Sequence, residues 1–136
     1  MNECLKKYPK SYETHVYRGK LYLRLKKYKE ALSDFERAIK ISPEKQIAYI
    51  GKGDCLRLSE NYEEAKALYV KALGLSKKIN PSILLRRAIC SMELKRYESA
   101  FDDIEELLSS DNENSEALYF KGLIFSKQST HWLIIS

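Results

Sequence analysis

The sequence is short of the residues that interrupt helices. It has only five glycines and three prolines in 136 residues, and these two residue types are the strongest local breakers of regular structure. The hydrophobic share of 44% and the charged share of 32% are those of a chain with a covered core and a solvated surface. The composition therefore excludes a disordered chain and favours helices.

Residues for crosslinks and for catalysis are scarce too. Cys4, Cys55 and Cys90 are odd in number and lack a Cys-x-x-Cys spacing, which argues against a disulfide framework and against a zinc site. The only histidines are His15 and His131, and no Gly-rich phosphate loop is present. We expect no catalysis, no metal and no cofactor, and we interpret Cys55 and Cys90 as small packing residues.

Long hydrophobic runs are missing as well. No run approaches the roughly 18 apolar residues of a membrane span, and residues 1–10 lack the apolar stretch of a signal peptide. The four apolar residues of 132–135 are too few to span a bilayer. Together with the unpaired cysteines, this predicts a soluble intracellular protein in a reducing compartment, cytoplasmic with the nucleus left open and with no membrane partner.

The charge is uneven along the chain. The formal net charge is +5 and the sequence pI is near 9.0. Bases outnumber acids twelve to six over residues 1–45, whereas acids lead eight to four over residues 81–114. Such a gradient favours an oriented protein partner over a uniform polyanion.

A period of 34 residues dominates the chain. Gly19, Gly53, Ala88 and Gly122 recur at steps of 34, 35 and 34, and Ala31, Ala65 and Ala100 follow the same frame. Small residues beside aromatics at fixed offsets are typical of closely packed antiparallel helices. We expect first helices at 12–25, 46–58, 81–94 and 115–127, and second helices at 28–41, 62–76 and 97–108. Asn61 is expected to cap one helix, and Asn80 with Pro81 to start another.

This pattern resembles the tetratricopeptide repeat family. The residues at the family's signature positions are Gly19, Tyr22, Ala31, Phe35, Ala38 and Pro43, then Gly53, Ala65, Tyr69 and Ala72, then Ala88 and Ala100, then Gly122. The resemblance implies an all-α right-handed superhelix, an α-solenoid of antiparallel helix pairs. We divide the chain into the end of a preceding repeat helix (1–11), three repeats (12–45, 46–80 and 81–114) and a partial fourth repeat with a truncated or divergent tail (115–136), in which a second helix would start near His131.

The resemblance also implies where a partner binds. In this family the first helices line a concave groove that holds extended peptides or helices. The corresponding residues are Val16, Lys20, Leu23, Ile47, Ile50, Asp54, Arg57, Leu85, Arg86, Ile89, Met92, Tyr119 and Leu123. An aliphatic stripe that faces water marks an interface more often than a core, so we expect a non-catalytic scaffold or adaptor that binds a partner peptide or helix.

One family variant grips the carboxylate of chaperone tails with Lys, Asn and Arg side chains on three first helices. Here those places hold Val16 and Lys20, then Gly51, then Ser82 and Arg86. Only Arg86 supplies a suitable donor, and a desolvated carboxylate without charged donors is not stabilised. We therefore do not expect this segment to bind chaperone tails.

Two alternatives stay open at this point. Arg18, Lys52, Arg87 and Lys121 stand one per repeat before the small residue, where such side chains pack their stems and direct their charges to water or, less often, form a phosphate track. A helical-repeat groove that reads RNA is the corresponding alternative function, although the aliphatic groove does not favour it. The segment can also serve as the regulatory or targeting part of a larger enzyme.

Overall fold

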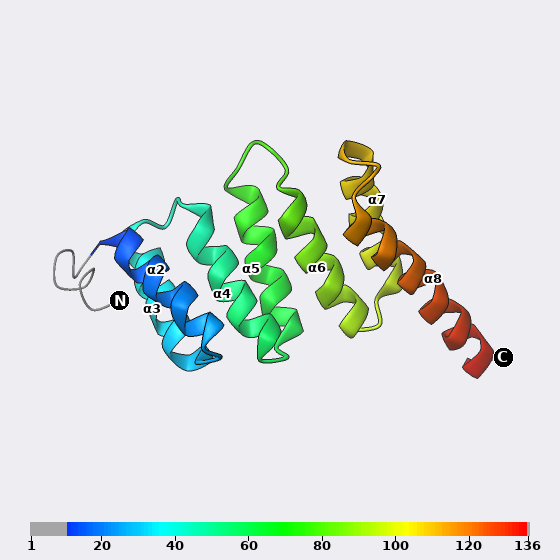
Figure 1. Cartoon of the computed structure of the whole chain (residues 1–136), viewed down its shortest axis with the longest axis horizontal. Coiled ribbons are helices and arrows are strands. Elements are labelled where there is room, and N and C mark those ends of the chain that lie inside the picture. Colours follow the sequence, from blue (N-terminus) through cyan, green and yellow to red (C-terminus); the bar gives the residue numbers. More distant parts are fainter. Residues whose placement is uncertain (1–10, 136) are drawn as a thin grey trace. The chain divides into compact units, whose positions relative to one another are not determined.

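The structure is a computed structural model that describes residues 11–135, with side chains through Gln128. The described residues form helices and contain no strand. The helices are α2 (Tyr12–Arg24), α3 (Tyr28–Ile41), α4 (Gln46–Leu58), α5 (Tyr62–Gly74), α6 (Pro81–Glu93), α7 (Tyr97–Ser110) and α8 (Ser115–Ile135) (Figure 1). The expected all-α class is confirmed. The expected end of an earlier helix over residues 1–11 falls almost entirely outside the described residues.

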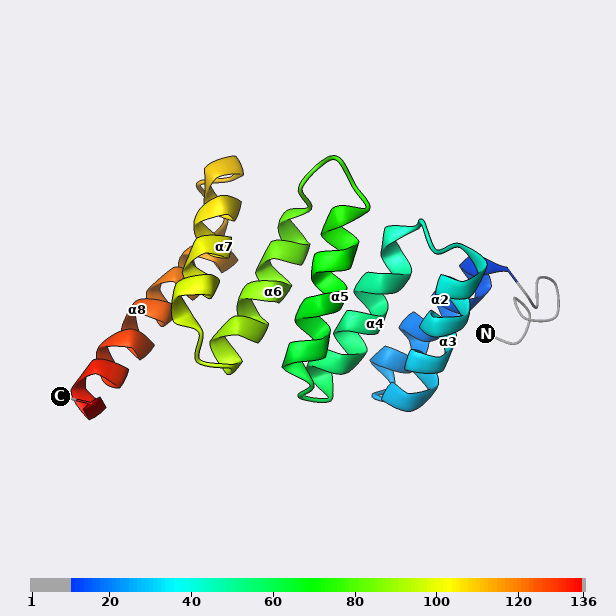
Figure 2. The ribbon, with the colours of Figure 1, turned by 180° about the vertical axis from the view of Figure 1, so that it is seen from behind.

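The chain divides into two compact units, one ending at Ile79 and one beginning at Asn80. In the first unit α2 pairs with α3 and α4 pairs with α5, while α3 and α2 also pack against α4. In the second unit α7 packs against both α6 and α8. Figures 1 and 2 show the antiparallel course of the helix pairs within each unit. Each unit is thus built from first and second helices that alternate along the chain.

The turn inside each complete repeat has the same backbone path. Lys26, Glu60 and Lys95 adopt positive φ angles of 61°, 67° and 61°, a left-handed conformation that costs a non-glycine residue roughly 1 kcal/mol. The next amide donates back to a carbonyl five residues earlier, as in the bond from Asn61 N–H to Leu56 O at 2.7 Å. This bond closes the end of the first helix. The sequence period therefore extends to the backbone.

The second helices supply the centre of the packing. Phe35 and Tyr69 are fully buried, and each is flanked by two buried alanines in its own helix. A Cβ added at Gly19 would stand 2.9 Å from Phe35 Cζ, and one at Gly53 would stand 2.7 Å from Tyr69 Cε1. Both distances are closer than real side chains approach, so glycine is required there. Pro43 lies exposed, and Tyr22 is half-buried.

The helix starts agree only in part with expectation. Asn80 caps α6 by accepting a hydrogen bond from the Ser82 amide at 3.0 Å, with Pro81 in the first turn. Asn61 stands at the N-cap of α5, but its side chain makes no capping bond. Asn61 adopts a ψ angle of 69°, because the left-handed turn before it fixes the approach of the chain. The cap expected from Asn61 is therefore wrong in its chemistry.

The last helix differs most from expectation. The sequence predicted a first helix ending near Lys127 and a second one starting near His131, but α8 runs without interruption to Ile135. Gly122 was expected to be a closely packed small residue. It is exposed instead, and no described atom comes within 4 Å of where its Cβ would be. Close packing at Gly122 is wrong because, within the described residues, no second helix covers α8.

A candidate peptide-binding surface on the first helices

The predicted groove residues of the first unit lie on α2 and α4 and differ in accessibility. Lys20 and Ile47 are exposed, and Leu23 and Ile50 are partly exposed. Val16 is only 8% exposed and belongs to a buried cluster with Tyr12 and Phe35. The expectation that Val16 faces water is wrong, because the Phe35 ring and its neighbours draw it into the core. The accessible part of this surface is therefore narrower than the sequence pattern.

Two further groove residues of the first unit are held by the core. The Tyr69 hydroxyl donates to Asp54 Oδ1 at 2.5 Å and accepts from Arg57 Nε at 3.2 Å. Arg57 also forms an ion pair with Asp54 at 3.6 Å. Burial, with the Asp54 charge as a second cause, raises the pKa of the Tyr69 phenol. A buried signature residue thus fixes the charged groups at the groove surface.

The second unit contains a pocket of about 180 Å³. Its lining residues come from α6, the turn after it, the start of α7, and α8: Ile89, Met92, Glu93, Lys95, Tyr97, Phe120, Leu123 and Lys127. Three of these, Ile89, Met92 and Leu123, belong to the predicted groove. The pocket combines an apolar lining with one carboxylate and two ammonium groups, a combination suited to a peptide side chain with charged neighbours.

The other predicted groove residues of this unit lie outside the pocket lining. Tyr119 is 64% exposed, and its ring contacts that of Phe120 at a centroid distance of 5.4 Å. Leu85 and Arg86 are partly exposed, and the Arg86 guanidinium donates to Ser82 Oγ at 3.0 Å. Met92 lines the pocket but is buried overall.

Sequence reasoning missed five lining residues: Glu93, Lys95, Tyr97, Phe120 and Lys127. Lys95 reaches the pocket from the left-handed turn, whose geometry no composition signal marks. Phe120 and Lys127 had a usable signal, since they stand three residues before and four residues after Leu123 and share its face of α8.

The four basic residues before the small positions are all paired. Arg18 binds Asp34, and Arg87 binds Asp103, in each case through two hydrogen bonds of 2.5–2.9 Å. Lys52 reaches Glu36 at 3.6 Å, and Lys121 reaches Glu105 at 2.8 Å. Because each cation already faces a carboxylate, these residues do not offer a phosphate track. The expected solvent-directed charge is also wrong for the two arginines, which lie mostly buried.

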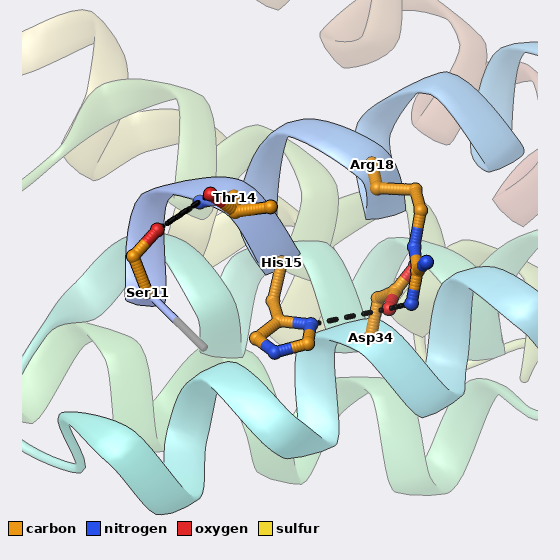
Figure 3. A network of polar contacts seen from close by, with 5 residues as sticks. All are labelled: Ser11, Thr14, His15, Arg18 and Asp34. Carbon is orange, nitrogen blue, oxygen red and sulfur yellow. Dashed lines mark hydrogen bonds and ion pairs between the residues drawn. The ribbon is translucent and has the colours of Figure 1, made fainter. Parts of the chain in front are cut away.

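The Arg18 pair is part of a larger network, drawn in Figure 3. Arg18 and His15 from α2 both turn toward Asp34 on α3 (Figure 3). The Asp34 side chain is 1% exposed, so His15 Nδ1 must carry the proton to donate to its carboxylate at 3.3 Å. The pKa of Arg18 is raised by its bonds to Asp34. The network ties the first helix of this repeat to the second.

Groups capable of other chemistry are enclosed. Cys55 and Cys90 are buried free thiols, and burial raises the pKa of Cys55 to about 12. A thiol held in its neutral form is a poor nucleophile. The described residues include no group of three or more His, Cys, Asp or Glu side chains that could hold a metal ion. No described helix is long and apolar enough to cross a membrane.

Known proteins provide an independent comparison. Two family models, both described as tetratricopeptide repeat, match residues 12–45 and 47–79. The chain is 28% identical over 137 residues to the DnaJ homolog subfamily C member 7 homolog of Schizosaccharomyces pombe, an alignment covering 90% of this chain and 28% of that protein. It is 31% identical over 71 residues to the Hsp70/Hsp90 co-chaperone CNS1 of Saccharomyces cerevisiae, covering 50% of this chain and 18% of that protein. The chain thus spans less than a third of either relative.

The fold also agrees with solved structures. The first TPR of Spaghetti (RPAP3) superimposes with a TM-score of 0.82 at 18% sequence identity, covering 88% of this chain and 94% of that one. The packing of small residues against aromatics, the common turn and the matched models all identify the same repeat. The chain belongs to the tetratricopeptide repeat family.

Proposed function

We propose that this chain is a non-catalytic protein-interaction scaffold that binds a peptide or helix of a partner protein through its first helices. The observation that carries this proposal is the pocket of the second unit, which has an apolar lining and a charged rim. A volume of about 180 Å³ is enough to admit one large side chain. Exposed Tyr119 beside the pocket adds an aromatic surface of the kind enriched at binding hot spots.

The rim favours a particular peptide. Lys95 and Lys127 bring two positive charges to the pocket and Glu93 brings one negative charge. An aliphatic or aromatic anchor with a neighbouring acidic residue would satisfy both the lining and the rim. We therefore propose an anchor of that kind as the recognised element, and the apolar contact as its main source of affinity.

Chaperone tails are the second candidate, and the comparisons favour them. One relative is named as an Hsp70/Hsp90 co-chaperone, and Spaghetti is bound to the HSP90 peptide SRMEEVD. That peptide has an apolar residue before two acidic ones. In this chain Val16 and Gly51 are buried at places where a carboxylate clamp needs donors. We propose that, if such a tail binds, its methionine enters the pocket and its terminal carboxylate contributes little.

A titration with three peptides tests this proposal. The probes are SRMEEVD, the same peptide with an amidated C-terminus, and a version with alanine in place of its methionine. Binding to the full chain, measured by fluorescence anisotropy, should survive amidation within about threefold and fall at least tenfold without the methionine. Loss on amidation alone would contradict the anchor mechanism, and no binding of SRMEEVD would exclude chaperone tails.

Variants of the chain locate the site. Ile89→Ser and Leu123→Ser remove apolar lining from two different helices and should each weaken the peptide about tenfold. The matched control is Leu118→Ser, which changes an equally large residue of α8 that lies outside the pocket lining. Equal loss in all three variants would place the binding elsewhere. A peptide library with anchors and acidic flanks replaces SRMEEVD if that sequence does not bind.

A further inference from the structure

Every complete repeat uses three first-helix positions to receive its own second helix. The first of these positions holds His15, Tyr49 and Leu84, the second holds Gly19, Gly53 and Ala88, and the third holds Tyr22, Leu56 and Ser91. All nine are buried except Tyr22, which is half-buried. These residues form the interface that joins the two helices of a repeat.

The same three positions of α8 are open. Leu118 is 49% exposed, Phe125 is 51% exposed and Gly122 is exposed with no described atom near its Cβ position. Phe125 keeps one contact, with the ring of Phe101 on α7 at a centroid distance of 5.5 Å. We name Leu118, Gly122 and Phe125 the open face of α8. It continues a series of helix interfaces of which three are filled within this chain.

The filled interfaces specify the side chain that fits over Gly122. Where the first helix has glycine, the second helix places an aromatic ring on it: Phe35 on Gly19 and Tyr69 on Gly53. Where the first helix has Ala88, the second helix carries the smaller Ile104 at the corresponding position. An alanine Cβ occupies the space that a ring needs, so ring and glycine go together. The open face, with Gly122, therefore fits an aromatic residue.

A second pairing narrows the match further. The arginine before the small residue in the first and third repeats binds an aspartate of its own second helix, Asp34 or Asp103. Lys52 of the second repeat turns instead to Glu36 of the preceding second helix, and Leu68 stands where the aspartates are. Lys121 likewise turns back to Glu105. The open face thus resembles the first helix of the second repeat, whose own partner is α5.

We propose that the open face of α8 docks an amphipathic helix of a partner protein with the side-chain pattern of α5. That helix presents an aromatic residue to Gly122, alanines four residues before and three residues after it, and an aliphatic residue in place of the aspartate. This face is distinct from the pocket, since none of its three residues lines the pocket. The mode is helix packing against a helix pair, and it does not depend on the peptide site.

A synthetic peptide with the sequence of residues 61–76 is the probe. Added to the full-length chain, it should shift the amide resonances of Gly122 and Phe125 in a titration followed by NMR. The same peptide with Tyr69→Ala lacks the ring and should bind at least tenfold more weakly. Ile89→Ser, which damages the pocket, should leave binding of the helical peptide unchanged, so failure of the peptide-site proposal is distinguishable from failure of this one.

Gly122→Ala gives the decisive variant because it is not expected to harm the fold. Alanine favours a helix over glycine, and the Cβ meets no described atom. On the open face it should nevertheless weaken the tyrosine peptide about tenfold or more through overpacking. It should bind a peptide with Tyr69→Ile better than the tyrosine peptide, as Ala88 packs with Ile104. No shift at Gly122 with millimolar peptide, or a preference that Gly122→Ala leaves unchanged, overturns the proposal.

Discussion

Asp34 is the residue whose replacement should reveal most about the packing of a repeat. Its side chain is 1% exposed and accepts bonds from Arg18 and His15. Asp34→Leu would leave the guanidinium, of which 19% of the side chain is exposed, without its counterion. Breaking a buried pair by removing one partner costs about 3–5 kcal/mol. Because Arg18 keeps some access to water, we expect the lower end, about 3 kcal/mol.

The second repeat provides the compensating change. It carries Lys52 and Leu68 at the positions of Arg18 and Asp34. The double variant Arg18→Lys/Asp34→Leu copies that pair, and replacing both members of a buried pair is often close to neutral. We expect its free energy of unfolding to lie within about 1 kcal/mol of wild type, because the lysine can extend its ammonium to solvent. The interaction between the two substitutions is therefore about 2 kcal/mol.

The assay is urea unfolding of the full chain followed by far-UV circular dichroism, with a melting curve in parallel. The single variant should lower Tm by about 10 °C, and the double variant should recover most of that loss. Asp103→Leu is the matched control, since Leu84 stands there in place of His15. It should destabilise less than Asp34→Leu by the share of His15. A double variant as unstable as the single one would refute the equivalence of the two pairs.

Three further predictions concern packing, thiol ionisation and capping. Gly53→Ala should destabilise by about 1–3 kcal/mol in urea unfolding, because its Cβ would stand 2.7 Å from the Tyr69 ring. Burial raises the pKa of Cys55 to about 12, so the unfolded thiol, with a pKa near 8.5, ionises first. Stability should then fall above about pH 9, by up to about 1.4 kcal/mol per pH unit from this group, and the difference between wild type and Cys55→Ala across that range measures it; equal slopes would exclude the effect. Asn80→Ala should cost about 1 kcal/mol of unfolding free energy, whereas Asn61→Ala should cost less, because Asn61 makes no capping bond.

The fold could be predicted from the sequence because its determinants are local and repeated. Gly53 and Ala65 recur with their counterparts at nearly constant spacing, and this spacing is set by the lengths of two helices and two turns. The left-handed residue of each turn could not be predicted. Lys26, Glu60 and Lys95 share a conformation but no common side-chain type, since the helix packing on either side enforces it.

The surface was harder to predict because exposure depends on what the neighbouring helix carries. Val16 and Ile89 lie at related places on their helices, yet Val16 is buried and Ile89 lines a pocket. Phe35 explains the difference, since its ring packs into the cluster that encloses Val16. Periodicity identifies the face of a helix but not the size of the side chain opposite it. Arg57 was expected as a free groove charge for the same reason, and Tyr69 instead engages it.

The basic residue before each small position contains more information than its charge. Arginine at this place pairs within its own repeat, and lysine pairs with the preceding second helix. The planar guanidinium can bind one carboxylate through two parallel bonds, and a lysine ammonium cannot. An aspartate in the second helix therefore accompanies arginine, and Leu68 accompanies Lys52. One side chain in the first helix thus indicates the character of its partner, and Lys121 beside Gly122 indicates a helix with an aliphatic residue next to an aromatic one.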